Sequence, residues 1–441
     1  MRLFFVAGES SGDLHGAHLI HALKKLAPTL ECEGLGGRQM ADAGMVLRHD
    51  LASEAIMGFT EVVKHFLPIR RLFLDTVKHL RESMPDAVIL IDYPGFNIRL
   101  AKEVHQLGIP VIYYVSPQVW AWKKKRLHTL AKYVSLMLVI FPFEESLYTN
   151  VGLKCVFVGH PLLDYIPAGD IRSANLPIGS FSIGLLPGSR AQEIERLLPP
   201  MLKIAHGIQT QHPQAQFVVP CVNEARATQI KAIIEGEGAC PILSPPLKGD
   251  LGGCFLETTT STHAEDQPPC LHPLSAGEGS RSENGSSSSA AQSASSTESA
   301  VSSPLTIEIT LNNTYDLLRD ARFCLVASGT ATLETALHGV PFVILYKVSP
   351  VTYQLARLVV DIEFIGIVNI LAGRGVVPEY IQHAADPGAI LPQALDLIAD
   401  TPARAQMIAD LAAIRGLLGS GGASDRAAAT ILEFLPPVSH V

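Results

Sequence analysis

A regular alternation of short apolar runs with segments of helical periodicity is the feature that most constrains the fold of this chain. The helical segment after the first run carries apolar positions at Leu14, Leu19 and Leu26. Such alternation is typical of βαβ units, whose strands form a parallel, doubly wound sheet with helices on its faces. In the first half the runs of strand length are Leu3–Val6, Val88–Ile91, Val111–Val115, Leu136–Ile140 and Val156–Val158.

The same pattern restarts at Phe181, after a polar stretch near residues 165–179. A chain of 441 residues exceeds what one hydrophobic core usually serves, so two domains are expected. We predict an α/β fold of two Rossmann-like domains, 1–170 and 171–415, facing each other across a cleft. The Ser-rich segment 248–304 has too little apolar material to order itself, which predicts a disordered insertion in the second domain. A regulatory or partner-binding loop is the alternative.

Composition argues against several classes of function. The formal net charge is −8, so there is no basic excess to neutralise the phosphates of a nucleic acid. The seven cysteines are scattered without a C-x-x-C spacing, which favours reduced thiols in a cytosolic protein and predicts no zinc site. The N-terminal run reaches Gly8 too early for a signal peptide, and the apolar stretch from Val134 to Phe143 is too short to span a bilayer. We therefore expect a soluble or peripheral protein.

Two strand-to-helix junctions in the second half have the chemistry of a phosphate site. The run Phe181–Leu186 stops at Pro187-Gly188-Ser189-Arg190, and a helical pattern follows. Unpaired N–H groups and the positive end of the helix dipole at such a junction favour an anion. Gly188 lets a ligand approach the backbone, and Arg190 offers a planar fork of donors to a phosphate. An ordinary turn with a solvated arginine is the alternative.

The second junction repeats this design. The run Phe323–Ala327 is followed by Ser328-Gly329-Thr330 and by a predicted helix over residues 331–338. The Ser328 and Thr330 hydroxyl groups could meet a second phosphate, and Glu334 could accept hydrogen bonds from ribose hydroxyls. A capped helix with an exposed glutamate is the alternative. Two such junctions in one half predict a nucleotide diphosphate site, and hence an enzyme acting on a nucleotide-activated substrate.

Polar residues also follow predicted strands of the first half, at the edge where open α/β sheets bind ligands. Asp92 follows Val88–Ile91, and a carboxylate fixed there can take a proton from an attacking hydroxyl. Glu9-Ser10-Ser11-Gly12-Asp13 offers N–H and hydroxyl groups that could hold a phosphate or sugar of a second substrate. Turn and helix-capping roles are the alternatives for both. No spacing in the sequence indicates a metal site, and His160 is interpreted as structural.

Two tryptophans, Trp120 and Trp122, directly precede Lys123-Lys124-Lys125. Aromatic rings lie at headgroup level in membrane interfaces, and lysines attract anionic lipid, so this segment predicts membrane contact. Partly buried aromatic side chains beside a solvated basic run are the alternative.

Taken together, these segments resemble the lipid-A-disaccharide synthases, a family of glycosyltransferases with the GT-B fold. The string Ser116-Pro117-Gln118-Val119-Trp120-Ala121-Trp122 is the specific part of the match, which covers nearly the whole chain outside the insertion. The matching segments are Gly8–Asp13, Ile56–Gly58 with Glu61, Ile91–Pro94 with Phe96 and Asn97, Val115–Trp122, Phe141–Glu144, Gly159 and His160, Leu186–Arg190 with Glu193, Ser328–Glu334, and Asn369–Arg374 with Glu379 and Gln382.

The resemblance implies transfer of 2,3-diacylglucosamine from UDP-2,3-diacylglucosamine to 2,3-diacylglucosamine 1-phosphate (lipid X), with inversion at the anomeric carbon and without a cofactor or metal. It implies that Asp92 is the base for the acceptor 6-hydroxyl and that Arg190 meets the UDP diphosphate. The predicted donor-binding residues are Gly188, Ser189, Arg190, Glu193, Ser328, Gly329, Thr330, Glu334, Asn369, Arg374 and Glu379. The predicted acceptor-binding residues are Glu9, Ser10, Ser11, Asp13, Glu61, Asn97 and Gln118.

The resemblance also implies a cytoplasmic enzyme that is peripherally associated with the inner membrane. It implies a C-terminal helix within residues 416–441, over about Ala423 to Phe434, that crosses back to the first domain or swaps in a homodimer. Three features depart from the family pattern: Gly95 replaces a second aspartate, Val368 replaces a frequent proline, and the insertion is not general. None of them touches Asp92 or Arg190.

Two alternative functions stay open at this point. One is another UDP-sugar enzyme of the GT-B fold, such as a lipid-linked N-acetylglucosaminyltransferase or an epimerase. The other is a non-catalytic, membrane-associated protein that binds a UDP-sugar. The Ser-Pro-Gln-Val-Trp-Ala-Trp string argues against the first, and the presence of Asp92 and Arg190 argues against the second.

Overall fold

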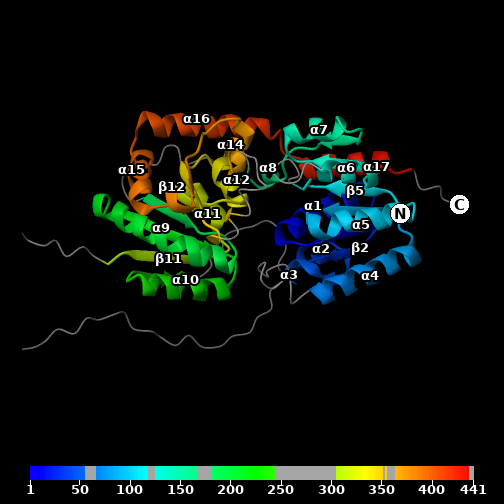
Figure 1. The fold of residues 1–441 in the computed structure, drawn as a ribbon, viewed down its shortest axis with the longest axis horizontal. Coiled ribbons are helices and arrows are strands. Elements are labelled where there is room, and N and C mark those ends of the chain that lie inside the picture. Colours follow the sequence, from blue (N-terminus) through cyan, green and yellow to red (C-terminus); the bar gives the residue numbers. More distant parts are fainter. Residues whose placement is uncertain are drawn as a thin grey trace, which may run out of the picture. The chain divides into compact units, whose positions relative to one another are not determined.

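The computed structural model describes residues 1–54, 66–117, 125–166, 181–244, 304–350, 353–354 and 363–436 (Figure 1). These residues belong to one compact unit formed by 1–246 and 304–441. The predicted disordered insertion, 248–304, lies outside the described residues except for Pro304.

The first half contains a parallel sheet with the strand order β3-β2-β1-β4-β5-β6-β7. Its strands are β1 (Arg2–Ala7), β2 (Glu31–Gly36), β3 (Val46–Asp50), β4 (Ala87–Ile91), β5 (Val111–Tyr114), β6 (Leu136–Val139) and β7 (Cys155–Phe157). Its helices are α1 (Ser10–Leu26), α2 (Arg38–Asp42), α3 (Leu51–Glu54), α4 (Phe66–Ser83), α5 (Pro94–Gln106), α6 (Lys125–Tyr133), α7 (Pro142–Thr149) and α8 (Leu162–Tyr165).

Successive strand residues of this sheet enter two different cores, because side chains alternate between its faces. Phe5 of β1 and Ile89 of β4 pack with apolar residues of α1 in one core. Phe4 and Val88, one residue earlier in each strand, pack with residues of α4, α5 and α6 in the other. Helices therefore cover both faces, which explains why β4 and β5 are apolar throughout (Figure 1).

The second half contains another parallel sheet, with the order β10-β11-β9-β8-β12-β13-β14. Its strands are β8 (Phe181–Leu186), β9 (Ala215–Cys221), β10 (Cys240–Leu243), β11 (Thr306–Leu311), β12 (Ala321–Ala327), β13 (Phe342–Tyr346) and β14 (Glu379–Ile381). Its helices are α9 (Ala191–Gln211), α10 (Glu224–Gly236), α11 (Thr314–Asp320), α12 (Thr330–Leu337), α14 (Ile367–Ala372), α15 (Pro387–Ile398) and α16 (Pro402–Leu417), with a short 3₁₀ turn at Gln382–Ala384. The prediction of an α/β fold with two Rossmann-like sheets is confirmed.

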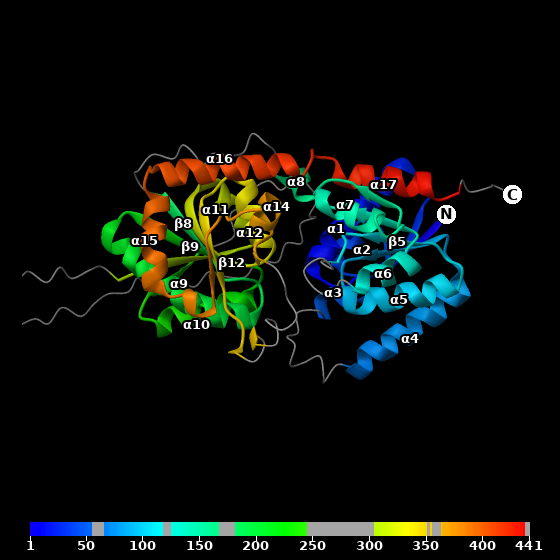
Figure 2. The ribbon, with the colours of Figure 1, turned by 45° about the horizontal axis from the view of Figure 1, so that its top comes forward.

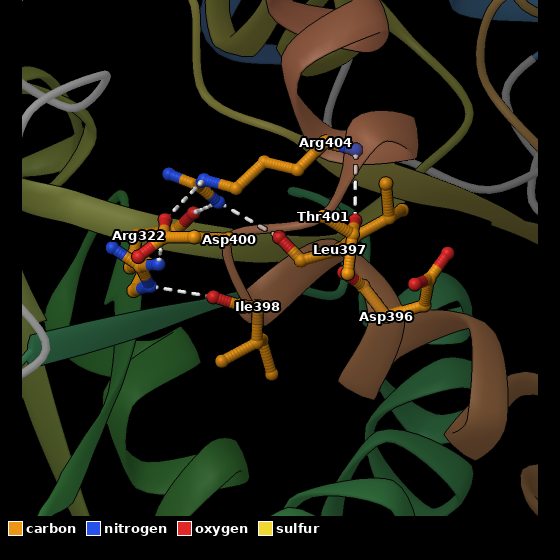
Figure 3. Close-up of polar contacts among 7 residues, drawn as sticks. All are labelled: Arg322, Asp396, Leu397, Ile398, Asp400, Thr401 and Arg404. Atoms are coloured by element: carbon orange, nitrogen blue, oxygen red, sulfur yellow. Dashed lines mark hydrogen bonds and ion pairs between the residues drawn. The ribbon is translucent and has the colours of Figure 1, made fainter.

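A buried arginine pair joins β12 to the turn between α15 and α16 (Figure 3). The Arg322 side chain donates from Nε to the Ile398 carbonyl oxygen and from Nη2 to Asp400 Oδ1, both at 2.6 Å. Arg404 donates from Nη1 to the carbonyl oxygens of Arg322 at 2.9 Å and Leu397 at 2.8 Å. Both guanidinium groups thereby satisfy backbone acceptors that are shielded from water.

The last helix, α17 (Ala423–Phe434), packs against α1, and the longer α16 packs on α12 and α14 (Figure 2). Arg426 of α17 donates from Nε to the Val158 carbonyl oxygen at 2.8 Å and from Nη2 to the Ser420 carbonyl oxygen at 2.8 Å. Asp164 of α8 accepts a hydrogen bond from the N–H of Ala423, which opens α17. The start of α17 is thus fixed by polar contacts to residues of the first half.

Candidate functional site

The turn between β8 and α9 needs glycine at Gly188. Its φ is +104°, and a Cβ atom there would lie 2.5 Å from Glu193 Oε2. Glu193 accepts hydrogen bonds from the Arg190 backbone N–H at 3.3 Å and from Arg190 Nη1 at 3.1 Å. Ser189 and Arg190 are exposed at the start of α9. Glu193 thus orients Arg190, whose side chain stands 62% exposed beside a helix N-terminus suited to an anion.

The turn between β12 and α12 lies directly beside the first one. Val326 of β12 pairs with Leu186 of β8, so the two strands end together at the carboxyl edge of the sheet. Gly329 and Thr330 are exposed, and Ser328 is anchored by its N–H to the Leu345 carbonyl oxygen at 3.1 Å. The sheet therefore brings together the two junctions that the sequence predicted for a nucleotide diphosphate.

Glu334 lies one turn into α12 and is held by Tyr315 of α11. The Tyr315 hydroxyl donates to Glu334 Oε1 at 3.2 Å. Burial raises the pKa of Glu334 above its ordinary value, and the Tyr315 hydrogen bond lowers it in part. The carboxylate is thus poorly solvated and has one oxygen already engaged.

Three other predicted donor residues are engaged in the fold. Asn369 is 1% exposed, and its Nδ2 donates to the Val377 carbonyl oxygen and to Glu379 Oε1, both at 2.8 Å. Glu379 also accepts from the backbone N–H groups of Ile365 and Gly366 at 2.9 Å. Arg374 pairs with Asp410 at 2.7 Å. These side chains thus shape the loop before β14, and their contact with the donor stays a prediction.

Asp92 directly follows β4 and has a left-handed backbone, with φ at +44°. Its carbonyl oxygen accepts hydrogen bonds from the Tyr113 hydroxyl at 2.5 Å and from Asn97 Nδ2 at 2.9 Å. Burial and then the charge of Glu9 raise the pKa of Asp92 to about 7, while the hydrogen bond from the Tyr93 backbone acts in the opposite direction. A carboxyl group poised near neutral pH is suited to general base catalysis.

The start of α1 lies next to Asp92, because Ala7 of β1 pairs with Ile91 of β4. Gly8 is required there, since a Cβ atom would lie 2.3 Å from the Tyr93 ring. Glu9 occupies the N-cap position of α1, with Ser10 exposed and Ser11 half-buried. Glu9 Oε2 also lies 3.9 Å from Arg190 Nη2, a long contact between two exposed groups that contributes little stability.

Two predicted acceptor residues are buried in the framework. Asp13 accepts hydrogen bonds from the N–H groups of Gly37 at 2.8 Å and Gln39 at 3.0 Å, which ties α1 to the start of α2. Asn97 is 0% exposed and donates to the carbonyl oxygens of Ile91 and Asp92. Both side chains thus hold framework elements together, and the buried Asn97 Oδ1 has no hydrogen-bond partner in the described part of the chain. Contact of either residue with the acceptor stays a prediction.

Several predicted residues fall outside the described part of the chain. These are Glu61 and Gln118 for the acceptor, and Trp120, Trp122, Lys123 and Lys124 for membrane contact. Lys125 begins α6, but its side chain is not described. In the part of the chain that the structure does describe, no helix is long and apolar enough to cross a bilayer.

Sequence reasoning missed two tyrosines, Tyr113 and Tyr315. Tyr113 is a fully buried residue within β5, and a buried phenol needs a hydrogen-bond partner. Tyr315 lies in the first turn of α11, which follows β11. The segment Leu311-Asn312-Asn313-Thr314 is therefore a third strand-to-helix junction at the same sheet edge. The sequence shows a tyrosine in a buried strand and another at a strand-to-helix junction. It does not show which residue either hydroxyl group contacts.

Two parallel seven-stranded sheets, each with ligand-type turns at its carboxyl edge, define the GT-B fold. The fold is similar to that of UDP-GlcNAc 2-epimerase from Neisseria meningitidis, with a TM-score of 0.57 at 13% identity, covering 98% of this chain and 100% of that one. A model of the lipid-A-disaccharide synthetase family matches residues 3–240 and 292–423.

Two curated relatives are both named lipid-A-disaccharide synthase. The one from Syntrophus aciditrophicus is 37% identical over 438 residues, covering 98% of this chain and 97% of the relative. The one from Geobacter sulfurreducens is 36% identical over 440 residues, with the same coverage. The chain belongs to the lipid-A-disaccharide synthase family, and it is a glycosyltransferase of lipid A biosynthesis.

Proposed function

We propose that this enzyme transfers 2,3-diacylglucosamine from UDP-2,3-diacylglucosamine to the 6-hydroxyl of lipid X. The products are the β(1→6)-linked disaccharide 1-phosphate and UDP. The observation that carries the proposal is Asp92, a carboxyl group with a pKa of about 7, held at a strand end by Tyr113 and Asn97.

Asp92 acts as the base in this mechanism. Its ionised carboxylate takes the proton of the acceptor 6-hydroxyl as that oxygen attacks the anomeric carbon of the donor sugar. The bond from that carbon to the UDP oxygen breaks, and UDP leaves with the electron pair. Attack from the side opposite UDP gives inversion.

The leaving diphosphate needs its growing negative charge stabilised. Arg190 supplies a guanidinium group, and the starts of α9 and α12 supply backbone N–H groups side by side. Ser189, Ser328 and Thr330 add hydroxyl donors at the same edge. We assign this stabilisation to the chain's own cationic and dipolar groups, in line with the prediction that no metal takes part.

We further propose that the enzyme meets its acylated substrates at the cytoplasmic surface of the inner membrane. Trp120, Trp122 and the three following lysines support this by their composition alone. A homodimer is implied by the family resemblance, and in such a dimer the α1 surface would receive α17 of the other copy.

An assay of UDP release, with and without lipid X, tests the reaction. We expect Asp92→Asn to bind UDP normally and to lose acceptor-dependent release by about 10²–10⁴-fold. Arg190→Ala should lose both release and UDP affinity. Asp42→Asn is the matched control, because Asp42 forms only an exposed ion pair with Arg38.

Two outcomes would contradict the proposal. Wild-type enzyme that binds UDP but releases none in response to lipid X would refute the assigned acceptor. If Asp92→Asn were as active as the control variant Asp42→Asn, a group other than Asp92 would have to accept the proton.

A further inference from the structure

We propose that Tyr315 is a positioning residue for donor recognition: its hydroxyl fixes one oxygen of Glu334 and leaves the other to the ribose of the nucleotide. The inference rests on the proposed function in one respect, that Glu334 contacts the donor ribose. Nothing in the sequence pattern or in the family match assigns a role to Tyr315.

The topology brings the two residues to one edge of the sheet. Tyr315 lies in the first turn of α11, which follows β11, and Glu334 lies in α12, which follows β12. All strands of this sheet are parallel, so both helices begin at the carboxyl edge, where the phosphate turns also lie. Tyr315 is therefore a neighbour of the donor site although it is far from that site's motifs in sequence.

Direct contacts hold the tyrosine and the glutamate together. The Tyr315 hydroxyl donates to Glu334 Oε1 at 3.2 Å, and the Tyr315 and His338 rings lie 5.6 Å apart between centroids. His338 Nδ1 in turn lies 2.9 Å from the Glu334 carbonyl oxygen, one turn back along α12. His338 thus holds the Tyr315 ring against α12, and the Tyr315 hydroxyl holds one oxygen of the Glu334 carboxylate.

The Tyr315 hydroxyl also affects the protonation state of Glu334. Burial raises the pKa of the Glu334 carboxyl, and the hydrogen bond from Tyr315 is the group that opposes this rise. An ionised carboxylate is the better acceptor for two sugar hydroxyls, since a protonated one has lost acceptor capacity. Removing the Tyr315 hydroxyl is therefore expected to raise the pKa of Glu334 further and to weaken ribose binding most at acidic pH.

A set of three ligands separates positioning from a merely structural role. Binding of UDP, 2′-deoxy-UDP and 3′-deoxy-UDP is measured by calorimetry for wild type, Tyr315→Phe and Glu334→Gln at about pH 6 and about pH 8. Tyr133→Phe, a half-buried tyrosine on α6 of the first half, is the matched control. Misfolded protein reduces binding of all three ligands equally, so the preference for UDP over a deoxy analogue reports on the ribose contact alone.

We expect wild type and Tyr133→Phe to prefer UDP over at least one deoxy analogue by roughly tenfold or more. In Tyr315→Phe the preference for UDP should fall about three- to fivefold, and the fall should be larger at the lower pH. With the full substrates, the KM for the donor should rise while kcat changes little, because ribose contacts form equally in the ground and transition states.

The outcomes separate this inference from the proposed function. If Glu334→Gln loses the preference and Tyr315→Phe keeps it at both pH values, the positioning role of Tyr315 is wrong while the Glu334 contact stands. If wild type does not prefer UDP over the deoxy analogues, or if Glu334→Gln keeps that preference, Glu334 does not contact the ribose. The positioning role of Tyr315 is then wrong as well.

Discussion

Asp92 and Tyr93 both have φ in the left-handed region, at +44° and +46°. Each such non-glycine residue costs roughly 1–3 kcal/mol, so surrounding contacts must hold the conformation. The Tyr113 hydroxyl and the Asn97 amide supply these contacts through the Asp92 carbonyl oxygen. The residue that bears the proposed base is thus fixed through its backbone carbonyl group.

The pH dependence of the reaction should reflect the carboxyl group of Asp92. The base must be ionised, so kcat/KM for lipid X is expected to fall as the pH drops through about 7. Because the negative charge of Glu9 raises this pKa, Glu9→Gln should move the acidic limb of the profile to lower pH.

Rates measured from about pH 5 to about pH 9 check this prediction. Glu31→Gln, which removes an exposed carboxylate at the start of β2, is the control and should leave the limb in place. An unshifted limb in Glu9→Gln would mean that burial alone sets the pKa of Asp92.

At the scale of elements, the arginine pair of Figure 3 fixes the helices that follow the second sheet. Arg404 is 2% exposed and satisfies two carbonyl oxygens, while Thr401 accepts from the Arg404 N–H at 3.1 Å and caps α16. The turn between α15 and α16 has no long apolar segment of its own, so these polar contacts determine where α16 begins.

Replacing Arg404 with methionine should lower the free energy of unfolding by about 1–3 kcal/mol, because it leaves two buried carbonyl oxygens without a donor. Urea titration measures the change. The control, Arg38→Met, removes an exposed i,i+4 pair and should stay within about 0.5 kcal/mol of wild type. Equal midpoints for the two variants would show that water replaces Arg404.

The elements themselves were largely predictable from sequence. The strand at Phe181–Leu186 and the helix at Ala423–Phe434 have the predicted bounds, since apolar periodicity and Gly or Pro boundaries are local signals. The hydrogen-bond partners of a side chain, in contrast, can lie far away in the sequence. Arg322 lies within the buried strand β12, and Asn369 donates a hydrogen bond to Glu379 across a loop. Apolar periodicity reveals neither of these contacts. The sequence therefore predicted the strand-to-helix junctions more reliably than the contacts of their side chains.

At the scale of the whole molecule, α17 links the end of the described chain to its beginning. Three of its alanines, Ala423, Ala427 and Ala428, are 0% exposed, and small side chains let the helix lie close to α1. Arg426 fixes its first turn to the Val158 carbonyl oxygen. The first Rossmann-like sheet thus has one of its faces completed by residues from the far end of the sequence.

Arg426→Ala should loosen this contact by removing hydrogen bonds to Val158, Ser420 and Gly421. We expect faster amide hydrogen exchange in α17 and in the facing α1, with β8 and β12 unchanged. Asp425→Asn is the control, because it breaks only an exposed contact with Lys25 at 4.0 Å. Unchanged exchange in α1 would show that apolar packing alone holds α17.

The pairing of α1 with α17 also sets an order for biosynthesis. The ribosome makes α1 long before α17, because the two helices are far apart along the sequence. At roughly 5–20 residues per second, the face of α1 that α17 covers stays open for tens of seconds in the nascent chain. The second Rossmann-like sheet can close as soon as its strands emerge, whereas the first must wait for a helix made after it. During that interval the apolar face of α1 is exposed to water in the unfinished chain.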